Sequence, residues 1–117
     1  MYADTADAAQ AKPHSVETVE IRVRGTVQGV GFRPTVWRLA RENNLTGRVL
    51  NDGAGVLIRT TGEQAGIARF LSSLKSNPPP LSRIERVEVR RLSQIVAFDG
   101  FAIEHSVAGE TRTNVTR

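Results

Sequence analysis

The sequence predicts an α+β fold in which two helices cover one face of a sheet. Five segments have the alternating or β-branched pattern of strands, and two longer segments repeat apolar residues at the spacing of a helix. Hydrophobic residues make up 39% and charged residues 24% of the 117 residues, which is typical of a folded globular domain. The predicted order is β-α-β-β-α-β with one additional strand.

The first strand is expected from Glu17 onward, where apolar and charged residues alternate strictly: Val19, Ile21 and Val23 against Glu20, Arg22 and Arg24. A glycine-rich stretch, GTVQGVG, ends this strand. Pro34 then opens a helix that is expected to end near Asn44, because proline is favoured in the first turn of a helix.

Two antiparallel strands are expected over residues 47–52 and 56–61, since the turn-rich sequence NDGAG joins them. The second helix is predicted from residue 63 to about 77, where Ile67, Leu71 and Leu74 share one face and three prolines follow. Residues 84–92 and 98–105 give the last two strands. This order, with its split β-α-β pattern, is the ferredoxin-like βαββαβ sandwich, here with a fifth strand at the edge of a mixed sheet.

The chain divides into one domain with two short flanks. Residues 1–16 have no periodic pattern and are expected to be a mobile leader, residues 17–105 form the domain, and residues 106–117 begin a polar linker. No apolar run approaches the roughly 20 residues that cross a bilayer, and no signal peptide is present, so we expect a cytoplasmic protein without membrane contact. With no cysteine and only His14 and His105, we expect no metal site and no cofactor.

The charge balance favours an anionic ligand. Sixteen Lys and Arg residues, mostly arginine, stand against twelve Asp and Glu, which gives a net charge of +4. RNA is one alternative, because the RNA-recognition motif has the same strand and helix order. However, the first and third strands, VEIRVRG and GVLIRTTG, contain no aromatic residue on which bases could stack, so we do not expect nucleic acid as a partner.

Two distant segments should meet at one end of this sheet. In the predicted topology the first and second strands are parallel, so the loop after the first strand lies beside Asn51 at the end of the second. The loop consists of Gln28, Gly29, Val30, Gly31, Phe32 and Arg33. Its two glycines can turn amide hydrogens inward, and the following helix start adds its positive end, which together favour a phosphate site.

Pro34 and the turn after Asn51 give further expectations for the residues of this phosphate site. Arg33 precedes Pro34 and is therefore expected at the cap position, outside the helix, where its guanidinium can close over the anion. Asp52 is interpreted as a turn-forming residue rather than a base. A lone G-x-G is more often a tight turn, so the hypothesis depends on the combination of the loop, Arg33 and Asn51.

These two segments, VRGTVQGVGFR and GRVLNDGAGV, resemble the paired signature of the acylphosphatase family. The resemblance extends from the first strand to the fifth. It implies that Arg33 and the loop amides from Gln28 to Arg33 hold the phosphate of an acyl phosphate, and that Asn51 orients the attacking water. Arg33 and Asn51 are therefore the candidate catalytic residues.

A narrower resemblance lies in GVGFRPTVWRLA, followed by NDGAGV, which is similar to the HypF group of hydrogenase-maturation carbamoyltransferases. The final residues, SVAGETRTNVTR, resemble the segment that joins this domain of HypF to the next. The resemblance implies carbamoyl phosphate as substrate, further HypF domains and HypE as partners, and a role in making the cyanide ligand of NiFe-hydrogenase. A free-standing acylphosphatase and a phosphate-binding module without turnover remain the alternatives.

Overall fold

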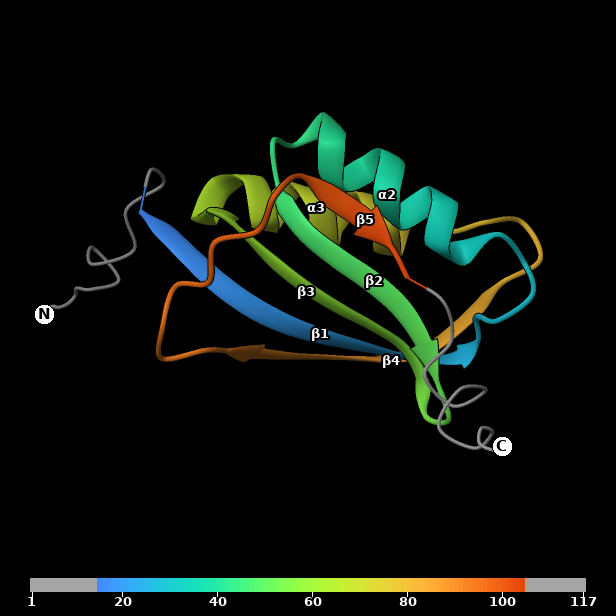
Figure 1. The fold of residues 1–117 in the computed structure, drawn as a ribbon. Helices are drawn as coiled ribbons and strands as arrows, with labels where there is room; N and C mark the ends of the chain where they lie inside the picture. The colour runs from blue at the N-terminus through green and yellow to red at the C-terminus, as the bar shows by residue number, and fades with distance from the viewer. Residues whose placement is uncertain (1–14, 105–117) are drawn as a thin grey trace, which may run out of the picture.

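The computed structural model describes residues 15–104 and places two helices on one face of a five-stranded sheet (Figure 1). The described elements are β1 (Val16–Thr26), α2 (Phe32–Glu42), β2 (Thr46–Asp52), β3 (Gly55–Glu63), α3 (Gln64–Ser76), β4 (Arg83–Arg91) and β5 (Phe101–Ile103). Their order along the chain is the predicted one. The ferredoxin-like fold class is therefore confirmed.

The order of strands across the sheet is β4-β1-β3-β2-β5. β3 runs antiparallel to both β1 and β2, so β1 and β2 are parallel to each other and finish at the same end of the sheet. β5 pairs in parallel with β2 over three residues, which makes the sheet mixed. The edge position predicted for the additional strand is therefore confirmed, and the topology brings the two predicted site segments together.

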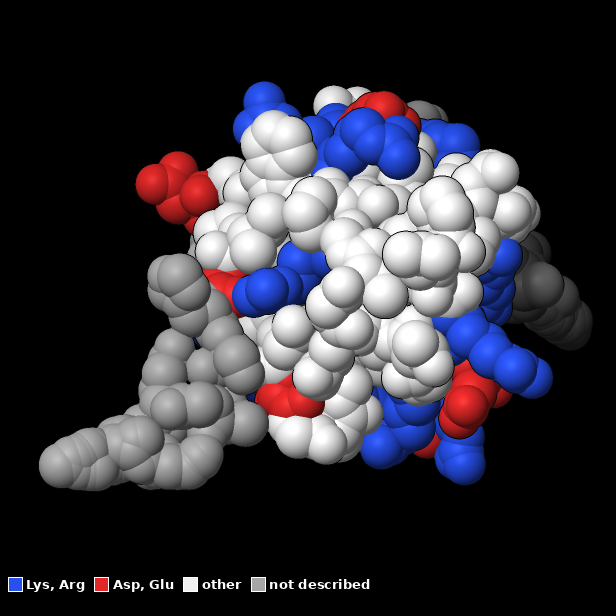
Figure 2. All heavy atoms as spheres, turned by 90° about the vertical axis from the view of Figure 1, so that its right-hand side faces the viewer, with Lys and Arg blue, Asp and Glu red and all other residues white. Residues whose placement is uncertain are grey.

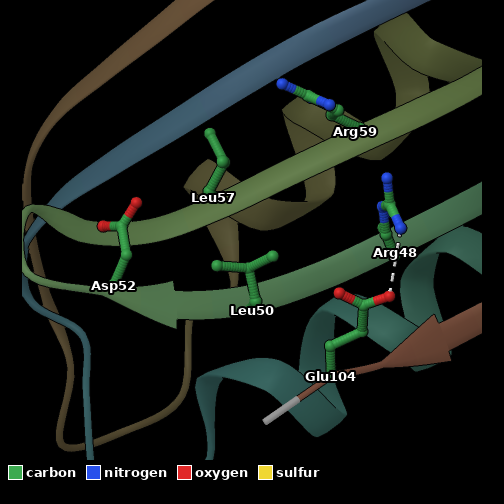
Figure 3. Close-up of a pocket in the computed structure, with 6 residues that line it drawn as sticks. All are labelled: Arg48, Leu50, Asp52, Leu57, Arg59 and Glu104. Carbon is green, nitrogen blue, oxygen red and sulfur yellow. Dashed lines mark hydrogen bonds and ion pairs between the residues drawn. The ribbon is translucent and has the colours of Figure 1, made fainter. Parts of the chain in front are cut away.

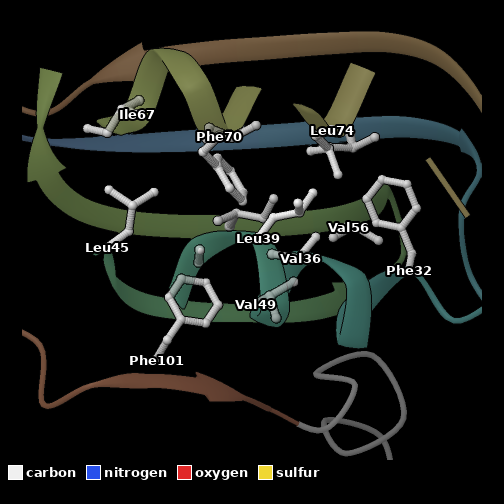
Figure 4. Close-up of a cluster of buried hydrophobic side chains, with 14 of the residues drawn as sticks. Phe32, Val36, Leu39, Leu45, Val49, Val56, Ile67, Phe70, Leu74 and Phe101 are labelled. Carbon is white, nitrogen blue, oxygen red and sulfur yellow. The ribbon is translucent and has the colours of Figure 1, made fainter. Parts of the chain in front are cut away.

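The core lies between the sheet and the two helices. Alternate residues of the strands face the helices, as the two-residue period of a strand requires, and Ile21, Val49 and Ile58 are completely buried. Each helix contributes one apolar face, and the labelled side chains meet in a single layer (Figure 4). The helix residues of this layer are Phe32, Val36 and Leu39 from α2 and Ile67, Phe70 and Leu74 from α3.

The two clearest differences from the sequence prediction are at the start of α2 and at the last strand. α2 begins at Phe32, two residues before Pro34, because Gly31 already turns the chain and Phe32 is buried at the helix start. The last strand covers three residues instead of 98–105, since Gly100 adopts a positive φ of 77° and breaks the extended chain before Phe101.

The predicted flanks fall mostly outside the described residues. β1 starts at Val16, one residue before the strand start expected at Glu17. Residues 1–14 and 105–117, with His14, His105 and the expected linker, lie outside the described part of the chain. Within that described part, no helix combines the length and apolar character needed to span a membrane.

Candidate functional site

The loop after β1 and the hairpin between β2 and β3 are joined directly by hydrogen bonds. The Gln28 side-chain nitrogen Nε2 donates to the carbonyl oxygen of Asp52 at 2.7 Å and to that of Gly55 at 3.0 Å. The two segments that the sequence placed together therefore lie in contact at one end of the sheet. Asn51 immediately precedes this hairpin turn.

The backbone of the loop adopts conformations that favour glycine. Gly29 has φ 76° and Gly31 has φ 80°, both in the left-handed region. A Cβ atom added to either glycine would meet no atom within 4 Å, so open space lies beside the loop at both positions. Backbone conformation, rather than crowding, is thus the reason for glycine here, and the loop leaves room for a ligand.

The start of α2 has amide hydrogens without a partner inside the helix. Gly31 is the N-cap, no side chain caps the helix, and its first turn contains no acidic residue. The Thr35 amide and hydroxyl both donate to the Gly31 carbonyl, at 3.4 and 3.2 Å, and Pro34 has no N–H to satisfy. Phe32 and Arg33 therefore keep first-turn N–H groups without an intrahelical acceptor, at the positive end of the helix dipole.

Arg33 is the second residue of α2, which corrects the expectation that Pro34 holds it outside the helix. Proline disfavours the helical conformation of the residue before it, but Gly31 takes the cap position and the buried Phe32 anchors the turn. Arg33 is half-buried, and its Nη1 donates to the carbonyl oxygen of Glu104 at 3.0 Å. Among the described residues no carboxylate pairs with it, so its positive charge remains available to an anion.

Asn51 carries a buried acceptor that is not satisfied. It follows Val49 on the helix-facing side of β2 and pairs with Val56 of β3. Within the described residues, its oxygen Oδ1 is buried and has no hydrogen-bond partner. Buried polar atoms are nearly always paired, so an unpaired one calls for an explanation such as a bound water.

Few charges surround this end of the molecule. Figure 2 shows that uncharged residues cover most of the middle of this surface, while most Lys and Arg lie around its rim and one blue group lies left of the centre. An anion bound near the loop would therefore face amide hydrogens and Arg33 more than carboxylates.

Asp52 is fixed in the turn after Asn51. Its Oδ1 accepts from the Ala54 amide at 2.9 Å and forms an ion pair with Arg22. Partial burial raises the pKa of Asp52, but the hydrogen bonds from Arg22 and Ala54 outweigh burial and leave the pKa below its ordinary value. The carboxylate is thus charged and occupied, in agreement with the interpretation of Asp52 as a turn-forming residue.

A cavity lies on the face of the sheet that points away from the helices. We do not place the candidate site there. The cavity has a volume of about 330 Å³ and a floor of Leu50 and Leu57, and Figure 3 shows the charged side chains around them. These charges are already matched, because Arg48 pairs with Glu104 at 3.3 Å and Arg59 with Glu20 at 2.9 Å. The cavity therefore belongs to a solvated face that is held together by its own ion pairs.

The ferredoxin-like fold, with a glycine loop next to an asparagine at the strand ends, defines an acylphosphatase-type domain. The acylphosphatase family model matches residues 19–103, and the chain belongs to this family. A crystal structure of acylphosphatase from Bacillus subtilis has the same fold, with a TM-score of 0.71 and 30% identity; the match covers 77% of this chain and 99% of that one.

Within the family, the chain is similar to one part of the HypF carbamoyltransferases. It is 48% identical over 97 residues to carbamoyltransferase HypF2 of Cupriavidus necator, a match that covers 81% of this chain and 12% of the relative. A crystal structure of full-length HypF in a phosphate- and nucleotide-bound form matches with a TM-score of 0.76 and 36% identity, over 83% of this chain and 13% of that one. The chain thus spans about an eighth of the length of these HypF relatives.

Proposed function

We propose that the domain hydrolyses acyl phosphates, with the phosphate held by the amides of residues 28–33 and by Arg33. The observation that carries the proposal is the hydrogen-bonded contact between Gln28, at the start of this loop, and the hairpin that follows Asn51. In the proposal Asn51, whose Oδ1 has no hydrogen-bond partner among the described residues, accepts a hydrogen bond from the attacking water and fixes its direction of attack. Membership in the acylphosphatase family supports the same reaction class.

The reaction needs no ionisable base from the protein. The oxygen of the oriented water bonds to phosphorus while the bond between phosphorus and the acyl oxygen breaks, and a carboxylate leaves. The water's proton passes to a phosphate oxygen of the substrate. Arg33 and the helix amides stabilise the negative charge on the phosphoryl oxygens, so catalysis consists of positioning and electrostatic stabilisation.

The specific substrate that we propose is carbamoyl phosphate, which would give carbamate and inorganic phosphate. Its support is the 48% identity to a HypF carbamoyltransferase across most of the chain. In this proposal the carbamate passes to further HypF domains and then to HypE, for the cyanide ligand of NiFe-hydrogenase. A free-standing acylphosphatase is the second candidate, because the B. subtilis enzyme matches over nearly its whole length.

Two substitutions separate phosphate binding from turnover. Asn51→Ala should keep phosphate affinity but lower kcat for acetyl phosphate by about 100- to 1,000-fold, the usual cost of removing one positioned group at a reacting centre. Arg33→Ala should lose both binding and turnover, because it removes the charge that holds the phosphate. Binding is measured by NMR titration with inorganic phosphate.

Arg38→Ala is the matched control for these variants. Arg38 lies on the same helix, is exposed, and among the described residues pairs only with Glu42, at 3.4 Å. The Arg38→Ala variant should bind phosphate and hydrolyse acetyl phosphate like the wild type. Equal hydrolysis by the wild type, Arg33→Ala and Asn51→Ala would overturn the proposed function.

A further inference from the structure

We infer that Gln28 is a positioning residue, whose side chain fixes Asn51 relative to the phosphate loop; the inference rests on the proposed function. Gln28 stands at the start of the loop, and its Nε2 bonds to carbonyls on both sides of the hairpin turn, those of Asp52 and Gly55. Asn51 is joined to the first of these residues by a peptide bond. The side chain therefore ties the segment that holds phosphate to the segment that holds the water.

The chemistry of the Gln28 side-chain amide shows which of its atoms makes these two hydrogen bonds and whether that atom can also donate to a phosphate. Both partners are carbonyl oxygens, so the atom that faces them must be the nitrogen. A primary amide nitrogen has two hydrogens, and two carbonyls use both of them. The Gln28 side-chain nitrogen thus has no hydrogen left for a phosphate oxygen, whereas its backbone amide is not involved in these bonds.

The other polar contacts of the hairpin among the described residues do not reach the loop. Arg22 and the Ala54 amide hold the Asp52 carboxylate, and Arg24 donates to the Ala54 carbonyl at 3.4 Å. Both arginines belong to β1 and act from the sheet. Gln28 alone among the described side chains forms hydrogen bonds that join residues 28–33 to this hairpin. Loss of its two bonds should leave each segment folded but free to shift against the other.

The expected effect is on turnover rather than on phosphate binding. A displacement of about 1 Å at a reacting group can lower the rate about 100-fold, so Gln28→Ala should lower kcat for acetyl phosphate by about 10- to 100-fold. The dissociation constant for inorganic phosphate should change less than about twofold, because the loop amides and Arg33 remain. Gln28→Glu should behave alike, since a carboxylate in the same shape has no hydrogen to donate.

Arg24→Gln is the control. It removes a bond to the same hairpin without touching the link to the loop, so kcat should stay within about twofold of the wild type. In addition, Gln28→Ala combined with Asn51→Ala should be no slower than Asn51→Ala by itself, because Gln28 acts through Asn51. If the double variant instead loses kcat by the combined effect of the two single substitutions, Gln28 does not act through Asn51.

The decisive experiment combines these rates with amide hydrogen exchange of residues 51–55 without substrate. Exchange in this hairpin should be faster in Gln28→Ala than in Arg24→Gln. Unchanged exchange together with weakened phosphate binding would overturn the inference, because Gln28 would then contact the ligand itself. A wild type that does not hydrolyse acetyl phosphate would contradict the proposed function, and the exchange rates would still decide whether Gln28 couples the loop to the hairpin.

Discussion

Single residues at the hairpin and the loop determine how the candidate site is held. Asp52 and Glu20 both have pKa values below the ordinary range: for Asp52 the bonds from Arg22 and Ala54 exceed the effect of burial, and for Glu20 the bond from Arg90 is the largest cause. A carboxylate whose pKa is lower in the folded state stabilises that state only while it is charged. A low pH should therefore decrease the free energy of unfolding of the domain.

The pH dependence of stability tests this point. As the pH falls through about 4, the ordinary range of Asp and Glu, the unfolded chain takes up protons before the folded one, so the free energy of unfolding decreases. Asp52→Asn should make this decrease shallower between pH 5 and pH 3. Urea unfolding at pH 7, 5, 4 and 3 measures it, and Asp99→Asn, an exposed loop carboxylate, serves as the control. Identical slopes for the wild type and Asp52→Asn would contradict the assignment.

Gly31→Ala tests the loop backbone. Gly31 has φ 80° and open space where a Cβ would stand, so the substitution adds backbone strain without a clash. The free energy of unfolding should decrease by about 1–2 kcal/mol, the usual cost of a left-handed conformation for alanine. Urea denaturation measures this change. A variant as stable as the wild type would show that the loop relaxes out of the left-handed region.

At the scale of elements, the short edge strand β5 depends on contacts outside its three-residue ladder. The Trp37 indole nitrogen donates to the carbonyl of Phe101 at 3.0 Å, and Arg33, one helical turn earlier, donates to that of Glu104. Arg41 lies over the Trp37 ring, 4.8 Å from its centre. α2 thus holds β5, which runs parallel to β2 toward the end of the sheet where the candidate site lies.

Trp37→Phe should loosen β5 while leaving the rest of the sheet intact. The aromatic ring remains, but the carbonyl of Phe101 loses its donor, at a cost of about 1 kcal/mol. Hydrogen exchange should accelerate at the amides of Gly47 and Glu104, which bond to Gly100 and Val49 across the β2–β5 pair. Amides in the β1–β3 pair serve as the internal reference. Uniform acceleration over the whole sheet would argue against a local role for Trp37.

At the scale of the whole molecule, residues 15–104 form one core and one candidate site, and the sequence contains no P-loop or comparable nucleotide-binding motif. It spans about 12% of a HypF relative. Transfer of a carbamoyl group requires activation of carbamate, a further step for which this chain has no recognisable site. We therefore expect this chain to hydrolyse carbamoyl phosphate but not to activate or transfer the carbamoyl group.

Labelled carbamoyl phosphate tests this expectation. The 117-residue chain should release carbamate and phosphate, but it should transfer no label to HypE when ATP is present, because free carbamate decays in water. Mass spectrometry of HypE gives the readout, and a full-length HypF serves as the positive control. Label on HypE from the short chain would show that it is self-sufficient.

The sequence by itself determined the order of the elements, the fold class and the two site segments. These follow from local physics: the two-residue period of Val19, Ile21 and Val23 marks a buried strand face, and the glycines at 29 and 31 mark a loop with unusual backbone angles. The roles of Arg33 and Asn51 came from a family resemblance, and they remain proposals.

Only the tertiary structure decided what the polar side chains contact. Nothing near Gln28 in the sequence signals that its amide bonds to residues 52 and 55, and nothing near Arg33 points to the carbonyl of Glu104. The length of β5 and the unpaired Oδ1 of Asn51 likewise depend on neighbours that are distant in sequence. The physical reason is that periodicity and turn propensity act over a few residues, whereas these hydrogen bonds form between segments that meet only after the sheet has assembled.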